Sequence, residues 1–396
     1  MKSLSVKKGQ LLREVLLPSS KSYANRALIL AALKTESTSL INLPRATDVT
    51  FLLECLKKIG LEIRDDKGKV QVENHFPACE TGDHVLEVGE GGTTARFLAT
   101  MLLLGKFKYR LILGERLKDR PWEDFLTVAR KLGARAELKG DVLVVQGPIQ
   151  LPQTLEMDCS LTTQFATAFQ LLSISRNLKV IPLNMHSSKS YWDMTEIMLS
   201  VFKEKNTYTI PLDWSSAGYP MAFAALNHEI HFPGLFLDSF QSDSKLYGIL
   251  SSLGYLEENL NGITVKPLNK QHSLSVDVSD CLDLVPTLAY LLAHIGGTHQ
   301  ITGFENLVYK ESNRLDEVLK LLKKFERKAY IEDAKFLIQG RAERDIGPVD
   351  LTFPNDHRMV MAGTLFLLHH SGGTVYPMEA VAKSYPDFFS MIRQSI

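Results

Sequence analysis

The sequence predicts an α/β (α+β) protein of two similar domains, each built from three copies of one repeat. Six times along the chain, a short polar segment leads into a helix of small and apolar residues, and an amphipathic helix follows. The amphipathic helices recur about every 70 residues, with one interval of 52. Such a repeat is one copied supersecondary unit, and it constrains the fold more strongly than any single motif.

The first helix of each repeat is expected to lie inside the protein. These helices carry almost no charge after their first turn, as in ALILAAL, FLATMLLL and PTLAYLLA. A helix that is apolar on all sides is typical of a buried position. The expected starts are Ser22, Thr93, Thr162, Ser215, Asp283 and Asp356.

The second helix of each repeat has one apolar face. VTFLLECLKKIG and LDEVLKLLKKF place Leu and Ile at i, i+3 and i+4, with Lys on the opposite face. This spacing predicts helices that cover the surface. Their expected starts are Asp48, Trp122, Tyr191, Asp243, Arg314 and Tyr385.

Short β-branched or alternating segments between the helices predict strands, because Gly, Pro, Asn and Asp bound them. Each full repeat therefore reads β-α-β-α-β-β. The domain boundary is expected at 210–213, because 203–209 leaves room for only one strand, so the third repeat is expected to be shortened. The predicted strands are 69–73, 109–113, 141–146, 179–183, 262–266, 299–302 and 335–339.

Composition narrows the class of protein. With 396 residues, 45% of them hydrophobic and 23% charged, the chain is typical of a globular protein of two domains. Its 45 basic and 45 acidic side chains give no overall field towards nucleic acid or membrane. Four scattered cysteines without a Cys-x-x-Cys pair argue against a zinc site. Without a signal peptide or an apolar run of about 18 residues, a soluble cytoplasmic protein is expected.

Lys or Arg recurs where the helices begin. A helix N-terminus already carries partial positive charge, so a cation there is misplaced unless an anion joins it. For any one of these side chains, a structural ion pair is the ordinary interpretation. Taken together, they predict a site for an anionic substrate. They are Lys21, Arg26, Arg96, Arg120, Lys310, Arg314 and Arg358.

Carboxylates also stand at helix starts. Asp48, Asp213 and Asp356 are interpreted as helix caps, which Asp commonly provides. For Asp283, capping and catalysis are equally consistent. Glu311 differs because Lys310 and Arg314 flank it, and a carboxylate held among cations can carry protons.

Eight segments resemble, in order, the successive motifs of the 5-enolpyruvylshikimate-3-phosphate synthases, which are enolpyruvyl transferases. They are PSSKSYANRALILAAL, GEGGTTARFLA, KDRPWEDFL, LTTQF, SSKSYWDMT, KESNRLDE, NDHRMVM and AKSYPDFF, and they run from Pro18 to Phe389. The resemblance implies two domains, 19–212 and 1–18 with 213–396, each an inside-out α/β barrel of three βαβαββ units, with the active site in the cleft between them.

The same resemblance implies the reaction. The enolpyruvyl group of phosphoenolpyruvate is transferred to the 5-hydroxyl of shikimate 3-phosphate and phosphate is released, a step of the shikimate pathway to chorismate and the aromatic amino acids. It implies no cofactor and no metal. The expected partners are the two small substrates, with no nucleic acid and no membrane, and the enzyme is expected to be a monomer.

Roles for individual residues follow from the resemblance alone. Asp283 would accept the hydroxyl proton, and Glu311 would protonate the methylene carbon and later take that proton back, with Lys21 as a third catalytic residue. Shikimate 3-phosphate would be bound by Lys21, Ser22, Arg26, Thr162, Thr163, Gln164, Ser188, Asp283, Asn306 and Lys310. Phosphoenolpyruvate would be bound by Lys21, Gly92, Arg120, Gln164, Arg314, Arg358 and Lys383.

Three positions depart from the pattern that the resemblance implies. Glu90 stands where Asn is usual, and its charge is expected to weaken phosphoenolpyruvate binding or to alter its pH dependence. Phe97 stands where Pro is usual, and Thr162-Thr163 replaces a pair of serines. None of these changes removes a residue that the mechanism requires.

Two alternatives remain. The enolpyruvyl transferase that acts on UDP-N-acetylglucosamine is similar in fold but uses a loop cysteine as its acid, and the corresponding loop here, GERLKDRP, contains none. The other alternative is an anion-binding homologue without catalysis. Retention of both Asp283 and Glu311 argues against it, because anion binding alone does not favour buried carboxylates.

Overall fold

The structure, a computed structural model, describes residues 1–66, 68–267, 273–340 and 346–393. The expected domains also include residues 67, 268–272, 341–345 and 394–396, which lie outside the described residues. The chain divides into two compact units. The first unit is Ser19–Pro211, and the second unit joins Met1–Pro18 to Leu212–Ile396.

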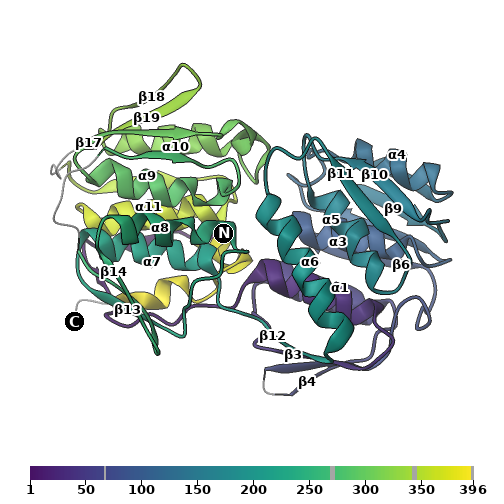
Figure 1. The fold of residues 1–396 in the computed structure, drawn as a ribbon. Helices are drawn as coiled ribbons and strands as arrows, with labels where there is room; N and C mark the ends of the chain where they lie inside the picture. Colours follow the sequence, from purple (N-terminus) through teal and green to yellow (C-terminus); the bar gives the residue numbers. More distant parts are fainter. Residues whose placement is uncertain (67, 268–272, 341–345, 394–396) are drawn as a thin grey trace. The chain divides into compact units, whose positions relative to one another are not determined.

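Three buried helices form the centre of the first unit, and each contacts the other two. They begin within two residues of the starts predicted from their apolar character, and almost every side chain on them is buried. Three amphipathic helices pack around them (Figure 1). The central helices are α1 (Lys21–Leu33), α3 (Gly92–Leu102) and α5 (Gln164–Leu171), and the outer ones are α2 (Thr47–Lys58), α4 (Glu123–Lys131) and α6 (Lys189–Glu204).

The sheets of the first unit follow the predicted repeat. Strands β6 (His84–Gly89), β7 (Lys108–Leu113), β8 (Arg135–Lys139) and β9 (Val142–Gln146) form the sheet β6-β7-β9-β8, in which β6 and β7 are parallel. With α3 and α4 between the strands, this is the predicted β-α-β-α-β-β order.

In the other two repeats of this unit, a strand that follows the third repeat pairs with the sheet of the first repeat. In the first, β3 (Thr38–Ile41), β4 (Ile63–Asp66) and β5 (Lys69–Val72) pair with the distant β12 (Thr207–Thr209). The third contains only the parallel pair β10 (Thr154–Asp158) and β11 (Lys179–Leu183). It lacks the following hairpin, which confirms the shortened third repeat.

The second unit is organised in the same way. Its central helices lie side by side in Figure 1 and contact one another, and two amphipathic helices accompany them. Short 3-10 turns, η2 (Ser242–Ser244) and η3 (Leu282–Leu284), lead into two of these helices. The central helices are α7 (Trp214–Leu226), α9 (Val285–His294) and α11 (His357–His369), and the others are α8 (Lys245–Ser252) and α10 (Arg314–Lys324).

The strands of the second unit form three main sheets and one short pair. The fifth repeat is complete as β16-β17-β19-β18, and the fourth forms β13-β15-β14. The sixth forms β1-β21-β20, and β2 pairs with β22. Bounds are β1 (Leu4–Val6), β2 (Gln10–Leu11), β13 (Ile230–Pro233), β14 (Leu256–Asn259), β15 (Gly262–Val265), β16 (Ser275–Asp277), β17 (Gly297–Thr302), β18 (Ala329–Glu332), β19 (Lys335–Gly340), β20 (Val349–Thr352), β21 (Gly373–Tyr376) and β22 (Ile392–Arg393).

The sixth repeat corrects one prediction. The amphipathic helix expected to begin near Tyr385 is absent from the described residues. This part of the chain forms two 3-10 turns, η5 (Met378–Lys383) and η6 (Phe388–Met391), instead. Pro386 explains the difference, because a proline disfavours helical geometry in the residue before it and removes a backbone donor. In the other full repeats, a hairpin pairs with the second strand of the repeat. In the sixth repeat, β1 from the start of the chain takes this place and pairs antiparallel with β21.

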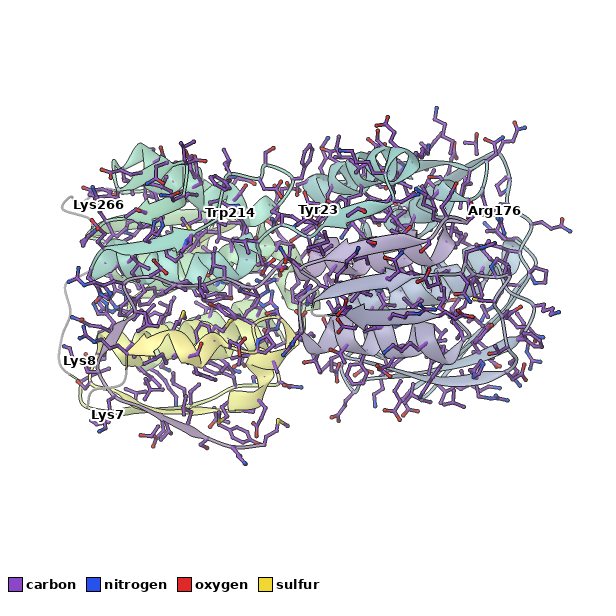
Figure 2. All side chains as sticks on the ribbon, turned by 90° about the horizontal axis from the view of Figure 1, so that it is seen from below. Lys7, Lys8, Tyr23, Arg176, Trp214 and Lys266 are labelled. Carbon is purple, nitrogen blue, oxygen red and sulfur yellow. The ribbon has the colours of Figure 1, made fainter. Side chains whose placement is uncertain are left out.

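The three tryptophans are packing residues. Trp122, Trp192 and Trp214 are all buried. Figure 2 labels Trp214 in the second unit, where its Nε1 donates to the Phe236 carbonyl at 3.0 Å. It also labels Tyr23 of the first unit, whose ring stacks on Tyr208 with centroids 6.4 Å apart. No helix within the described residues is long and apolar enough to cross a membrane.

Candidate active site

In the first unit, the start of α1 carries an ion pair. Lys21, the first residue of α1, places its Nζ 2.8 Å from Oδ2 of Asp48 in the first turn of α2. The interpretation of Asp48 as a helix cap is wrong, because Ala46 is the N-cap of α2 and no side chain caps it. Asp48 instead neutralises Lys21, and both side chains are largely removed from solvent.

Arg26 is a buried cation held by neutral groups. Only 3% of it is exposed, and it donates from Nε to Thr195 Oγ1 at 2.7 Å and from Nη2 to the Tyr191 carbonyl at 3.2 Å. Nη1 donates to the Ser22 carbonyl at 2.9 Å. Burial lowers the pKa of Arg26 to about 10. A charge buried without a carboxylate partner among the described residues is costly, and it leaves the guanidinium un-neutralised.

Arg96 lies in α3 and Arg120 lies just before α4, and both side chains place their guanidiniums near the starts of α3 and α5. Arg96 is buried and donates from Nη1 to Gln164 Oε1 at 2.9 Å and to Thr162 Oγ1 at 3.3 Å. Burial, together with the repulsion of Arg120, holds the pKa of Arg96 well below its ordinary value. Nε of Arg120 is buried with no hydrogen-bond partner among the described residues. The two guanidiniums therefore concentrate positive charge at these helix starts.

Gly92 makes room for Arg120. A Cβ atom at Gly92 would lie 2.8 Å from Arg120 Nη1 and 3.0 Å from Gln164 Oε1. Gly92 is also the first residue of α3, where backbone N–H groups are available to an anion. Gly92 and Arg120, both expected at the phosphoenolpyruvate site, therefore lie against each other in the first unit.

Thr163 and Ser188 are the N-cap residues of α5 and α6. Ser188 has the left-handed backbone conformation, with φ 62° and ψ 29°, and its side chain does not cap the helix. Non-glycine residues in this conformation are uncommon and occur disproportionately at functional sites. The Ser188 hydroxyl is thus presented by a strained backbone rather than used within α6.

In the second unit, Arg314 joins three carboxylates. The side chain is fully buried, and Nη1 donates to Asp283 Oδ1 at 2.7 Å. Nη2 donates to Glu311 Oε2 at 2.5 Å, and Nε to Asp356 Oδ2 at 3.1 Å. Burial acts to lower the pKa of Arg314, but the three carboxylates outweigh it and raise that pKa above its ordinary value. Arg314 therefore remains charged and fixes the positions of Asp283 and Glu311.

Asp283 lies among three cations. Besides Arg314, Arg358 Nη2 is 3.0 Å from Asp283 Oδ2 and Lys310 Nζ is 3.3 Å from Oδ1. Burial would raise the pKa of Asp283, but Arg358, Lys310 and Arg314 outweigh it and hold that pKa well below its ordinary value. Leu284, not Asp283, is the N-cap of α9. Of the two interpretations left open by the sequence, capping is therefore wrong.

Glu311 bridges Arg314 and a second cation. Lys383, the last residue of η5, places Nζ 3.4 Å from Glu311 Oε1. Asn306 lies in the 3-10 turn η4 (Glu305–Tyr309), directly before Lys310, and is half-buried. The candidate site residues of the second unit therefore converge on Asp283 and Glu311. Asn306 is the exception, because it is near them in sequence only.

The capping interpretation is confirmed for two aspartates. Asp213 caps α7 by accepting from Ser216 N at 2.9 Å. Asp356 caps α11 by accepting from Arg358 N at 3.0 Å. Asp356 also accepts from Ser312 Oγ at 2.9 Å and from Arg314, so this cap helps to hold the arginine as well.

Sequence reasoning missed Asp243 and Ser215 as members of this cluster. Asp243 is buried, accepts from Ser215 Oγ and lies 3.8 Å from Arg358 Nη1. Burial raises the pKa of Asp243 to about 6, with Arg358 opposing the shift and Asp283 adding to it. Both residues stand at helix starts of the fourth repeat. The sequence shows that both residues lie at helix starts, but the recurrence of cations at such starts does not predict a role for these hydrogen-bond acceptors.

The two clusters differ in charge. The second unit places Lys310, Arg314, Arg358 and Lys383 against four carboxylates, so it is nearly neutral. In the first unit, Arg26 and Arg96 donate only to neutral groups among the described residues, and the Arg120 guanidinium lies against Gly92. No group of three or more potential metal ligands occurs in the described parts of the chain. The geometry suits polyanion binding and proton transfer.

Comparison with known proteins identifies the family. The sequence profile of EPSP synthase (3-phosphoshikimate 1-carboxyvinyltransferase) matches residues 6–205 and 201–392. The chain belongs to the EPSP synthase family. It is similar to a 3-phosphoshikimate 1-carboxyvinyltransferase of Methanococcoides burtonii, with 30% identity over 96% of this chain and 95% of the relative. A relative so named from Vibrio cholerae serotype O1 is 29% identical over 100% and 99%.

Solved structures support the fold of an EPSP synthase. The chain is similar to the EPSP synthase of Acinetobacter baumannii, with TM-score 0.75, 22% identity and coverage of 99% and 97%. It is also similar to the enolpyruvyl transferase NikO of Streptomyces tendae, with TM-score 0.77, 14% identity and coverage of 98% and 95%. These similarities confirm the predicted α/β fold class.

One departure from the EPSP synthase pattern acquires a structural reason. Phe97, where the resemblance implies Pro, is buried, and the Arg26 guanidinium lies 5.3 Å from its ring centroid. The Tyr191 ring lies 5.6 Å from the same guanidinium. Cation–π contacts of this kind stabilise a positive charge without neutralising it. Phe97 therefore helps to keep Arg26 charged and available.

Proposed function

We propose that this chain catalyses the reaction for which its family is named. It transfers the enolpyruvyl group of phosphoenolpyruvate to the 5-hydroxyl of shikimate 3-phosphate and releases phosphate. The observation that carries this proposal is the pair of carboxylates, Asp283 and Glu311, that one buried guanidinium holds within the second unit. Two carboxylates in different environments can act as separate acid and base.

Both substrates are polyanions, and the first unit supplies cations that its own carboxylates do not neutralise. We assign shikimate 3-phosphate to Arg26 together with hydroxyl and amide side chains, since planar guanidiniums bind phosphate in bidentate fashion. The full set is Lys21, Ser22, Arg26, Thr162, Thr163, Gln164, Ser188, Asp283, Asn306 and Lys310. We assign phosphoenolpyruvate to Lys21, Gly92, Arg120, Gln164, Arg314, Arg358 and Lys383.

The proposed chemistry has an addition and an elimination. In the addition, the 5-hydroxyl oxygen bonds to the central carbon of phosphoenolpyruvate while Asp283 accepts the hydroxyl proton. Glu311, in its protonated form, gives a proton to the methylene carbon, which becomes a methyl group. In the elimination, ionised Glu311 takes one proton back, the double bond re-forms, and the carbon–oxygen bond to phosphate breaks. Cations around the departing phosphate stabilise its charge.

The low pKa of Asp283 suits a base that substrate activates. In the ligand-free protein, Arg358, Lys310 and Arg314 hold its pKa well below the ordinary value, against the effect of burial. Such a carboxylate is ionised but accepts protons weakly. The carboxylate and phosphate of phosphoenolpyruvate compete for Arg314 and Arg358, which weakens their hold on Asp283. Substrate binding therefore raises the basicity of Asp283 where it is needed.

The direct test is phosphate release by the purified chain with both substrates and with each omitted in turn. Release that requires both, with a product that carries the enolpyruvyl ether, supports the proposal. Release with phosphoenolpyruvate alone would indicate simple hydrolysis and would contradict it. Replacing shikimate 3-phosphate by UDP-N-acetylglucosamine tests the related transferase activity, and no release is expected.

We also propose that the enzyme works as a cytoplasmic monomer without a cofactor. The equal numbers of acidic and basic residues support the absence of nucleic acid and of an anionic membrane surface as partners. Sedimentation of the purified chain at working concentration tests the oligomeric state. A dimer that persists on dilution would contradict this part of the proposal.

A further inference from the structure

Glu90 lies where two loops meet, at the carboxyl ends of the parallel strands β6 and β7. It follows β6 directly, and β6 runs parallel to β7, so the loops after both strands leave the sheet at the same edge. The Gly114 N–H, just after β7, donates to the Gly89 carbonyl at 2.9 Å. Residue 90 is therefore adjacent to the start of the loop 114–121, which we call the arginine loop because it carries Arg120.

The Glu90 carboxylate is directed at the base of the arginine loop. A Cβ atom at Gly114 would lie 2.3 Å from Glu90 Cδ and 2.5 and 2.7 Å from the two carboxylate oxygens. Only glycine at 114 allows this approach. Oε1 also accepts a long hydrogen bond, 3.4 Å, from Arg116 N. The half-buried carboxylate therefore packs flat on the loop backbone.

From this base, a series of turns leads to Arg120. The Gly114 carbonyl accepts from Leu117 N at 3.0 Å and from Lys118 N at 3.2 Å. The Leu117 carbonyl accepts from Arg120 N at 3.3 Å. Leu117 is fully buried, which anchors the middle of the loop. The position of Gly114 therefore determines where the backbone of Arg120 lies.

Arg120 depends on this backbone path for its position. Its Nη1 lies against Gly92 at the start of α3, and its Nε has no hydrogen-bond partner among the described residues. Because Nε makes no hydrogen bond that would fix the side chain, the backbone that carries Arg120 contributes strongly to the position of its guanidinium. A small displacement at the base of the loop would therefore move it away from the helix start.

We infer that Glu90 is a positioning residue for phosphoenolpyruvate binding: its carboxylate holds the base of the arginine loop and so sets Arg120 against the start of α3. This inference rests on the proposed function, in which Arg120 binds phosphoenolpyruvate. It reverses the expectation from the sequence that the charge of Glu90 weakens binding. It also explains why Gly114 accompanies Glu90.

The test uses Glu90→Ala and Glu90→Gln, with phosphoenolpyruvate and shikimate 3-phosphate varied separately. Glu90→Ala should raise the KM for phosphoenolpyruvate about tenfold, the scale expected when a binding group is misplaced by a fraction of an ångström. The KM for shikimate 3-phosphate should stay unchanged. Glu90→Gln should be close to the unmodified chain, because its amide oxygen keeps the shape and can still accept from Arg116 N.

Two further variants separate positioning from charge. Adding Glu90→Ala to Arg120→Ala should raise the KM for phosphoenolpyruvate no further, because Glu90 acts through Arg120. Glu87→Ala, at an exposed position three residues earlier, removes the same charge and should have no effect. A lower KM in Glu90→Ala or Glu90→Gln would show that the charge repels substrate and would overturn the inference. An additive effect with Arg120→Ala would overturn it too.

The inference and the proposed function fail in different ways. If the unmodified chain shows no turnover, the proposed reaction is wrong, and calorimetric binding of phosphoenolpyruvate then replaces KM as the measurement. Weaker binding in Glu90→Ala, with Glu90→Gln unaffected, would still support positioning. Equal binding by all three would overturn it. Circular dichroism shows that each variant is folded before comparison.

Discussion

Arg26 and Arg314 are both buried, but only Arg314 has carboxylate partners, so their removal should have different effects on stability. Arg26 keeps its charge although burial lowers its pKa to about 10. Relative to an ordinary value of about 12.5, this corresponds to a cost of about 3 kcal/mol at neutral pH. Because the folded pKa is lowered, the cost is present below about pH 10 and disappears as the pH rises above the ordinary value.

Replacing Arg26 by Met removes this cost and keeps much of the packing on Phe97. It also removes three hydrogen bonds, each worth about 1 kcal/mol. The Tyr191 carbonyl keeps a partner, because Thr195 Oγ1 donates to it at 2.9 Å. The free energy of unfolding of Arg26→Met should therefore stay within about 1 kcal/mol of the unmodified chain. Binding of shikimate 3-phosphate should be lost.

Arg314→Met provides the matched comparison. It leaves Asp283, Glu311 and Asp356 without their shared cation, and breaking a buried ion pair in this way costs about 3–5 kcal/mol. Arg314→Met, which removes the cation that three carboxylates share, should therefore be clearly more destabilising than Arg26→Met.

Urea unfolding followed by tryptophan fluorescence can assign each effect to its unit. Trp122 and Trp192 report on the first unit and Trp214 on the second, so Trp→Phe backgrounds separate the two transitions. A loss of 3 kcal/mol or more in Arg26→Met would refute the reasoning, because it would mean that the charge of Arg26 is compensated within the protein.

Three other predictions follow from the contacts of the two clusters. Glu311→Gln should lower kcat far more than the affinity for shikimate 3-phosphate; equal losses in steady-state kinetics would remove its role as proton carrier. Gly92→Ala places a Cβ 2.8 Å from Arg120 Nη1 and should raise the KM for phosphoenolpyruvate about tenfold, and an unchanged KM would contradict the close approach. Burial raises the pKa of Asp243 to about 6, so this carboxyl binds a proton more tightly in the folded protein. Lowering the pH from 7 to 5 should therefore stabilise the second unit by about 1 kcal/mol. Unfolding measured by Trp214 fluorescence should show this gain, and Asp243→Asn should abolish it.

The sequence predicted most of the fold because the signals are local. A polar start followed by an apolar run located the six central helices of the described residues within about two residues, because a buried helix is apolar on all sides. The sixth amphipathic helix does not form within the described residues, because Pro386 interrupts the segment after Tyr385. The role of β1 could not be read locally, since its partner β21 lies more than 360 residues away.

The site was less predictable, because ion pairing depends on which distant residues meet. Lys21 and Asp48 pair across 27 residues of sequence, and Arg26 reaches Thr195 across 169. The sequence shows which of these residues are charged. It does not show that Lys21 is neutralised by a carboxylate and that Arg26 is not. The same limit applies to Asp243, whose burial beside Arg358 and Ser215 no local pattern reveals.

The completion of the sixth repeat by β1 has a consequence for folding during synthesis. The first unit, Ser19–Pro211, is continuous, so all its strands are available once residue 211 has been made. The second unit is not, because β1 and β2 must wait for β21 and β22. Pairings of such sequence separation are slow to form and leave strand edges exposed in the meantime. Residues 4–11 are thus synthesised well before their partners, and a chaperone that shields them would act until β21 and β22 have been made.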